Sequence, residues 1–193
     1  MKENQDFARL VSLACHDLRT PLATVYGFAR TLTRTGDLEE PAARYLGMIE
    51  AASEQMSALL DDLGLVARIT SGRYEPIQLE RDTLELARAA AERAGATVTA
   101  SGEGGAVQVD GEPVERALAG LALAAQRHGG VDAVTIAAAG RVLRIAPVTA
   151  AAAPVVLARE LKDLGAAVGL RVLAAVGAEV ALDGDALAVE LPA

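Results

Sequence analysis

Residues 7–32 read FARLVSLACHDLRTPLATVYGFARTL, and the spacing of the apolar side chains in this stretch decides the fold of the first part of the chain. An α-helix has about 3.6 residues per turn, so apolar residues that recur at steps of four and three share one face. We therefore expect one long amphipathic helix whose apolar face centres on Leu18. The residues of this face are Phe7, Val11, Ala14, Leu18, Leu22, Val25, Ala29 and Leu32.

A second helix is predicted directly after the first. Residues 35–37 (TGD) end the first pattern, and Pro41 is tolerated because it falls in the first turn of the next helix. Over residues 45–66 the apolar side chains alternate steps of four and three without a break, which is a heptad repeat. Its members are Tyr45, Ile49, Ala52, Met56, Leu59, Leu63 and Val66. The two helices are expected to form an antiparallel hairpin.

The hairpin alone would bury only part of its two apolar faces. Pairing with a second copy closes a four-helix bundle, so we expect a homodimer. The first helix also contains a mechanically weak point. Two successive steps of four within residues 14–22 relax a left-handed supercoil, and Pro21 removes a backbone hydrogen bond in the same stretch.

Residues 70–76 (TSGRYEP) interrupt the helical periodicity and separate a second part with a mixed pattern. Helices are predicted at 82–94 and 112–127, and one or two helices at 155–176. Short strands are predicted at 97–99, 107–109, 134–136, 142–145, 179–182 and 187–191, with turns at 139–141 and 183–185. The fold class is therefore α+β: a helical hairpin in residues 1–70, then an α/β sandwich in residues 77–193.

Composition and charge exclude several classes of function. A formal net charge of −8 argues against a nucleic-acid partner, because phosphate binding needs clustered Lys and Arg. No apolar run is long enough for a membrane helix, and the polar residues 1–6 do not resemble a signal peptide, so we expect a cytoplasmic protein without a membrane span. The single cysteine, Cys15, and the two histidines, His16 and His128, make a metal site unexpected. Cys15 is expected to be half-buried in packing.

His16 is predicted to be exposed, because it lies about 160° around the helix from Leu18. Arg9, Thr20 and Gly27 lie on nearly the same side of the helix as His16. The small residues among them leave room for another protein to dock. A surface histidine without a role is the alternative interpretation. The expected docking residues are Arg9, Arg19, Ala23 and Gly27, with Thr20 among them on this side.

The run His16–Leu22 (HDLRTPL) resembles the phosphoacceptor motif of sensor histidine kinases, and residues 5–70 look like their dimerisation and histidine phosphotransfer domain. The resemblance implies that His16 carries phosphate on a ring nitrogen and passes it to an aspartate of a response-regulator receiver domain. It makes Asp17 the acid–base residue, and Thr20 matches a position that helps water to remove phosphate from the regulator. The chemistry agrees, because imidazole is nucleophilic at cellular pH and an adjacent carboxylate can orient the ring and accept its proton.

Residues 77–192 resemble the ATP-binding domain that follows in such kinases, best over residues 109–118 (VDGEPVERAL). The family's asparagine-rich segment is replaced by residues 120–125 (GLALAA), so that Ala124 stands at the position of the magnesium ligand. The family's Asp-X-Gly-X-Gly loop is replaced by residues 146–154 (APVTAAAAP), and its glycine-rich lid survives only as residues 164–170 (LGAAVGL). We expect a degenerate domain that binds neither ATP nor a metal ion productively, with His128 as a surface residue at a helix end.

Three functions follow from these expectations. The leading hypothesis is a histidine phosphotransferase that relays phosphoryl groups through His16 between response regulators, without a cofactor. The first alternative is a divergent but active histidine kinase that uses ATP and Mg²⁺. The second is a pseudokinase, phosphatase-like or purely scaffolding, whose dimer sequesters a response regulator.

Overall fold

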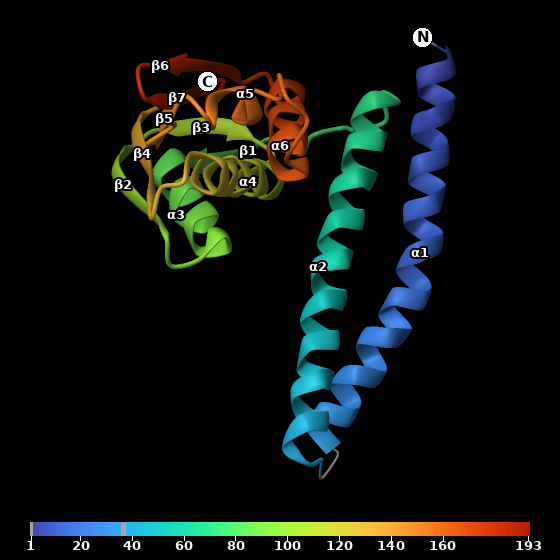
Figure 1. Ribbon diagram of the computed structural model, residues 1–193. Helices are drawn as coiled ribbons and strands as arrows, with labels where there is room; N and C mark the ends of the chain where they lie inside the picture. The colour runs from blue at the N-terminus through green and yellow to red at the C-terminus, as the bar shows by residue number, and fades with distance from the viewer. Residues whose placement is uncertain (1, 36–37) are drawn as a thin grey trace. The chain divides into compact units, whose positions relative to one another are not determined.

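A computed structural model describes residues 2–35 and 38–193, without the side chains of residues 2–7, 9, 10 and 35. The chain divides into two compact units, Met1–Tyr74 and Glu75–Ala193, which are described separately (Figure 1). Within the described residues no helix is both long enough and apolar enough to cross a lipid bilayer.

The first unit is a hairpin of two long helices, α1 (Lys2–Thr35) and α2 (Glu40–Thr70), as predicted (Figure 1). Pro41 lies in the first turn of α2, where its missing N–H costs no helical hydrogen bond. The predicted turn residues Gly36 and Asp37 lie outside the described residues. At the other end of α2, Ser71 closes the last turn, since its N–H and its hydroxyl both donate to the carbonyl of Ala67.

Each helix of the hairpin carries two stripes, one residue apart in sequence. The inner stripe mixes apolar and polar residues and packs against the other helix, whereas the outer stripe is apolar, is about half exposed and includes Leu18 and Val25 on α1 and Ile49 and Met56 on α2. The inner stripe keeps Leu22 and Ala29 of the predicted apolar face, but Leu18, the predicted centre of that face, is 55% exposed and lies in the outer stripe. The expected centre of the apolar face is therefore wrong for a single copy of the chain. The inner stripe of α1 contains Ala8, Ser12, Cys15, Leu22, Tyr26 and Ala29, and that of α2 contains Leu46, Glu50, Ser53, Ser57, Leu60, Gly64 and Ala67.

The second unit contains a five-stranded sheet in the order β2-β4-β5-β7-β6. Strand β2 runs parallel to β4, and all other neighbours are antiparallel. The strands are β2 (Val98–Gly104), β4 (Val134–Gly140), β5 (Val142–Ala146), β6 (Glu179–Asp183) and β7 (Ala186–Glu190). The helices are α3 (Thr83–Ala94), α4 (Gly111–Gly129), α5 (Ala153–Val156) and α6 (Leu164–Ala175).

Strand β1 (Leu79–Asp82) of this unit differs from the sequence-based expectation, whereas the region 155–176 agrees with it, since one or two helices are predicted there. Strand β1 has no apolar alternation and was not predicted; it forms by pairing with β3 (Ala106–Val109), with Leu79 opposite Val109. The predicted helical region 155–176 consists of two helices, of which α5 is a single turn. Ala158 follows α5 with a positive φ of 49°, a conformation that cannot continue a right-handed helix.

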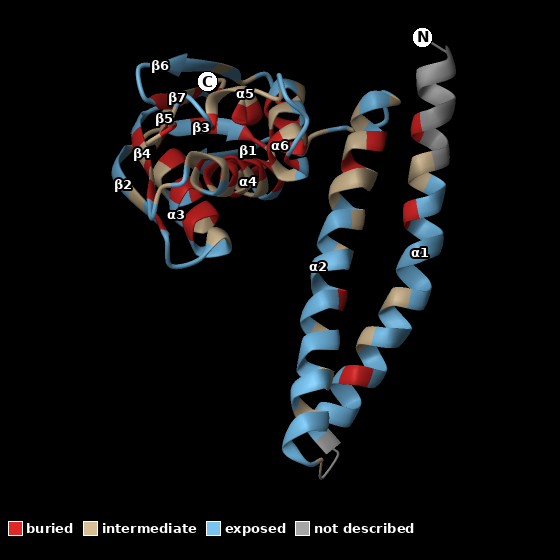
Figure 2. Cartoon of the chain, in the orientation of Figure 1, coloured by how far each residue is buried: buried red, intermediate tan, exposed pale blue. Residues whose placement is uncertain are grey.

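The core of the second unit lies between the sheet and helices α3 and α4. Buried side chains from alternate positions of the central strands face helical leucines, so one sheet face is apolar. Figure 2 shows this concentration of buried residues, whereas the hairpin is mostly exposed. The largest members of the core include Leu86, Leu118, Leu121, Ile136, Leu143, Ile145 and Leu187.

Helices α4 and α6 cross with very little space between their backbones. A Cβ atom added to Gly169 in α6 would stand 2.9 Å from the carbonyl oxygen of Ala117 in α4, and one added to Gly120 would stand 3.0 Å from that of Gly165. Helix packing therefore accounts for the glycines at these positions.

Gly169→Ala is expected to lower the free energy of unfolding of the second unit by about 1–3 kcal/mol, because the added methyl group meets backbone that must shift. Gly64→Ala in α2 is the matched control, since a Cβ there meets nothing within 4 Å. It should stabilise the hairpin by about 0.5–1 kcal/mol. Urea unfolding followed by circular dichroism and amide NMR measures both, and an undiminished stability of Gly169→Ala would contradict the close crossing.

Candidate functional site

His16 projects from α1 into solvent, with its side chain 77% exposed. Its ring Nδ1 lies 3.1 Å from Oδ1 of Asp17. An ionised carboxylate can only accept a hydrogen bond, so in a neutral ring Nδ1 carries the proton and Nε2 keeps its lone pair. In that tautomer the lone pair of Nε2 is on the side chain's solvent-exposed ring.

The other predicted site residues of α1 fall into two groups. Thr20, Ala23 and Gly27 are exposed and, by helical spacing, lie on the side of His16. Arg19 is exposed too, but its Nη2 donates a 2.7 Å hydrogen bond to Oδ1 of Asp61 on α2. The side chain of Arg9 lies outside the described part of the chain.

Asp61 was missed by the sequence reasoning. It belongs to the second helix, 42 residues after Arg19, and no local pattern marks it. Only the antiparallel register of the hairpin brings the two side chains together, and a helical-wheel comparison of both helices in that register could have found the pair.

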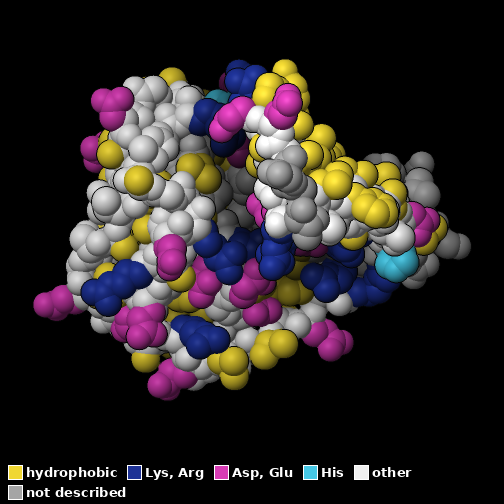
Figure 3. Space-filling view, turned by 90° about the horizontal axis from the view of Figure 1, so that it is seen from below, with side chains coloured by type: hydrophobic (Ala, Val, Ile, Leu, Met, Phe, Trp, Pro, Cys, Tyr) yellow, Lys and Arg dark blue, Asp and Glu magenta, His cyan; other side chains and the backbone are white. Residues whose placement is uncertain are grey.

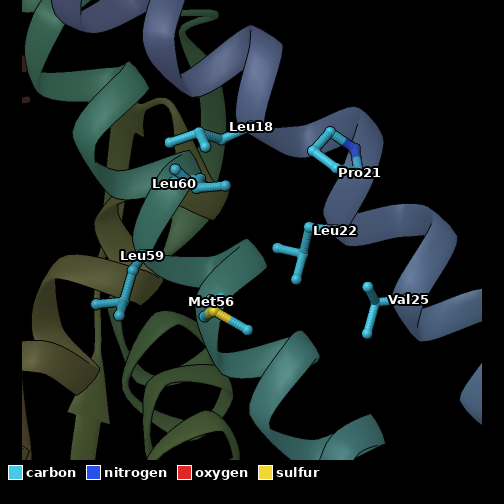
Figure 4. A pocket seen from close by; sticks show the side chains of 7 residues that line it. All are labelled: Leu18, Pro21, Leu22, Val25, Met56, Leu59 and Leu60. Carbon is cyan, nitrogen blue, oxygen red and sulfur yellow. The ribbon is translucent and has the colours of Figure 1, made fainter.

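An apolar groove of about 400 Å³ opens between α1 and α2 next to Pro21 (Figure 4). Two of the residues that line it, Val25 and Met56, are about half exposed. Figure 3 shows apolar side chains reaching the surface in groups, with charged side chains of both signs around them. The groove is lined by Leu18, Pro21, Leu22, Val25, Met56, Leu59 and Leu60.

In the second unit, residues 120–125 and 146–154 stand where the resembling kinases contact the nucleotide. Here these segments contribute buried apolar side chains to the packing. Ala124 is fully buried in α4, and Val148 and Ala152 of the segment 146–154 are buried as well. Among the side chains that the structure describes, no three from His, Cys, Asp or Glu are close enough together to hold a metal ion.

A buried carboxylate joins the end of α4 to the start of α6. Asp163, whose side chain is 5% exposed, accepts a hydrogen bond from the N–H of Ala166 and so caps α6. Its other oxygen lies 2.6 Å from Nη1 of Arg127 and 3.3 Å from Nε2 of His128. His128 is therefore half-buried in an ionic cluster, and the expectation of a plain surface residue is wrong. Sequence reasoning also missed Asp163, although an Asp directly before a helix is a recognisable N-cap signal.

Comparisons with known proteins agree with this architecture. Residues 8–72 match the model of the His Kinase A (phospho-acceptor) domain. Two Mycobacterium tuberculosis proteins are similar: the probable sensor histidine kinase TcrY is 37% identical over 82 residues, and the sensor histidine kinase TrcS is 36% identical over 80 residues. These alignments cover 42% and 40% of this chain but only 16% and 15% of the relatives, so the chain spans a small part of their length.

Two solved structures share the fold of nearly the whole chain. Full-length ShkA in complex with AMPPNP has a TM-score of 0.66 at 22% identity, over 95% of this chain and 45% of ShkA. The Acinetobacter baumannii histidine kinase AdeS has a TM-score of 0.55 at 17% identity, over 92% of this chain and 97% of that structure. Residues 8–72 thus carry a His Kinase A (phospho-acceptor) domain, and nearly the whole chain shares the fold of these two solved structures. These findings support a relationship to the two-component sensor histidine kinase family.

Asp163→Ala is expected to lower the free energy of unfolding of the second unit by about 1–3 kcal/mol, because it removes the α6 cap and leaves Arg127 and His128 without their carboxylate. Asp183→Ala removes a carboxylate whose ion pair with Arg144 is largely exposed. That control should cost at most about 1 kcal/mol. Thermal and urea unfolding measure both variants, and equal losses would show that the buried cluster contributes nothing special.

Proposed function

We propose that the chain is a histidine phosphotransferase that carries phosphoryl groups on His16 between aspartates of response-regulator receiver domains. The observation that carries the proposal is the exposed imidazole of His16 with Nδ1 held by Asp17. The family match over residues 8–72 supports it. The pair is also exposed on the hairpin, where a partner protein can reach it.

The proposed transfer needs no redox step or metal on this chain. The Nε2 lone pair attacks the phosphorus of a receiver's aspartyl phosphate, and the bond from phosphorus to the carboxylate oxygen breaks. The receiver regains its carboxylate, while the Nδ1 proton passes to Asp17 or solvent, which leaves a neutral ring bearing the phosphoryl group. The reverse sequence delivers the phosphoryl group to a second receiver.

We propose that the second unit does not bind ATP with magnesium. A triphosphate needs a metal ligand and positive charge to compensate its own charge. Ala124 offers a buried methyl group, and the Asp163 carboxylate already takes the α6 N-terminus and the Arg127 guanidinium. We therefore propose that phosphate comes from another protein and that no cofactor is required.

The docking surface for a receiver domain is proposed to be the His16 side of α1. Thr20, Ala23 and Gly27 continue this side beyond the histidine, and their small side chains allow close approach. Thr20 lies one turn after His16, within reach of a water molecule at the phosphoryl group, so a phosphatase contribution is assigned to it.

A second copy of the chain is proposed to cover the exposed apolar stripe of the hairpin. Leu18, Val25 and Leu32 repeat every seven residues on α1, and Ile49 and Met56 do so on α2. A regular heptad of half-exposed apolar residues fits another helix better than an irregular partner. Two hairpins joined in this way form a four-helix bundle.

Transfer is tested with two purified receiver domains, of which only the first is loaded with ³²P from labelled acetyl phosphate. The wild-type chain should acquire acid-labile label and pass it to a second receiver, whereas His16→Ala should fall to background because the acceptor nitrogen is gone. His128→Ala is the matched control, since it removes the other histidine and should keep transfer. Thr20→Ala should keep transfer and slow the loss of phosphate from the receiver.

The same assay separates the competing functions. Incubation with γ-³²P-ATP and Mg²⁺ alone should leave the chain unlabelled; acid-labile label on His16 in that sample would favour the divergent kinase. Signalling that neither His16→Ala nor Thr20→Ala affects would leave only the scaffold.

Val25→Glu is expected to weaken the homodimer at least about tenfold, because it places a charge in the exposed apolar stripe. Thr24→Glu adds the same charge at the neighbouring exposed position, outside this stripe, and should leave the dimer intact. Sedimentation velocity over a concentration series measures both. A wild-type chain that stays monomeric at tens of micromolar would contradict the proposed bundle.

A further inference from the structure

Polar side chains tie α1 to α2 along one side of the hairpin. In each tie the two residue numbers have the same sum, which is the mark of a single antiparallel register. We call these contacts the polar ladder. Its rungs are Arg19 with Asp61 at 2.7 Å, the Tyr26 hydroxyl with Glu54 Oε1 at 3.1 Å, and Arg30 Nε with Glu50 Oε1 at 4.0 Å.

The rung nearest to His16 differs from the other two. Arg19 is three residues from His16, so the two exposed side chains are neighbours on the helix surface, about 5–6 Å apart at their Cβ atoms. Tyr26 and Arg30 are at least ten residues away, about 15 Å or more along the axis, and both lie beyond Pro21. Only the Arg19 rung of the ladder is therefore within reach of a group attached to His16.

We propose that Arg19 is a phosphate-responsive latch: Asp61 holds it across the hairpin, and a phosphoryl group on His16 takes the guanidinium away. The proposal rests on the proposed phosphorylation of His16. A phosphoryl group brings nearly two negative charges and three acceptor oxygens, whereas Asp61 offers one charge. Guanidinium binds phosphate in a bidentate manner, and both partners of the existing ion pair are about half exposed, so that pair is weak.

Release of Arg19 changes the hairpin on one side of Pro21. The segment of α1 before the proline loses its rung of the ladder, while the rungs of Tyr26 and Arg30 still hold the segment after it. Pro21 interrupts the helical hydrogen bonds between these segments, so α1 can bend there. The phosphorylation state of His16 is thereby converted into a difference in helix geometry at the docking surface.

The test loads the full chain with potassium phosphoramidate, a small donor that needs no receiver domain, and follows phosphohistidine by ³¹P NMR. Asp61→Asn should load about two- to fivefold faster than wild type, because it frees Arg19 to stabilise the incoming phosphoryl group. Arg19→Gln should load more slowly, and adding Asp61→Asn to it should change nothing. Glu54→Gln is the matched control: it removes the same charge from a rung beyond Pro21 and should load like wild type.

A second readout follows the guanidinium ¹⁵N signals of the arginines. Loading of the wild-type chain should shift the Arg19 signal and leave that of Arg30 unchanged. An unmoved Arg19 signal, or an Asp61→Asn effect that persists in the Arg19→Gln background, overturns the latch without touching the proposed transfer.

The two proposals fail separately. Phosphoramidate loading with the expected Arg19 response, but no uptake of phosphate from phosphorylated receivers, would overturn the relay and leave the latch standing. A wild-type chain that forms no phosphohistidine with phosphoramidate would overturn both.

Discussion

Each long helix of the hairpin has more apolar surface than its partner helix can cover, and this constraint governs the first unit. The inner stripe, which includes Ala8 and Cys15, is buried where α1 packs against α2. The outer stripe, which includes Leu18 and Val25, remains about half exposed. Because apolar burial is the main driving force for helix association, a single hairpin leaves much of its stabilisation unrealised. The side of α1 that carries His16 belongs to neither stripe, which keeps the histidine accessible.

The second unit satisfies its polar groups internally instead. The Asp163 carboxylate contacts the α6 N-terminus, Arg127 and His128. These three groups would attract an anion, and the carboxylate already occupies that role. The close crossing of α4 and α6 at Gly169 tightens the same corner. These contacts stabilise, in this chain, the fold that it shares with ShkA and AdeS.

The sequence predicted the elements well where periodicity is strong, and poorly where contacts are distant. Both long helices and the hairpins β4–β5 and β6–β7 follow from apolar spacing and from turn residues such as Gly140 and Gly184. Strand β1 has no such spacing and depends on its partner β3. Which stripe faces the other helix depends on a rotation of the helix by one residue, about 100°. Because the two stripes are adjacent, the sequence of one helix does not decide between them. Contacts such as Arg19 with Asp61 depend on the register and could not be read from either helix alone.

The burial of Cys15 has a consequence for chemical selectivity. Cysteine and histidine are both nucleophiles toward electrophilic donors, and here they are adjacent in sequence. A helix turns about 100° per residue, so neighbours point in different directions: the thiol lies in the interior of the hairpin, 3% exposed, while the imidazole lies outside. A reagent or oxidant that approaches this turn therefore meets the imidazole and not the thiol. The helical pitch turns the thiol toward α2, whose packing shields it, and leaves the imidazole in solvent.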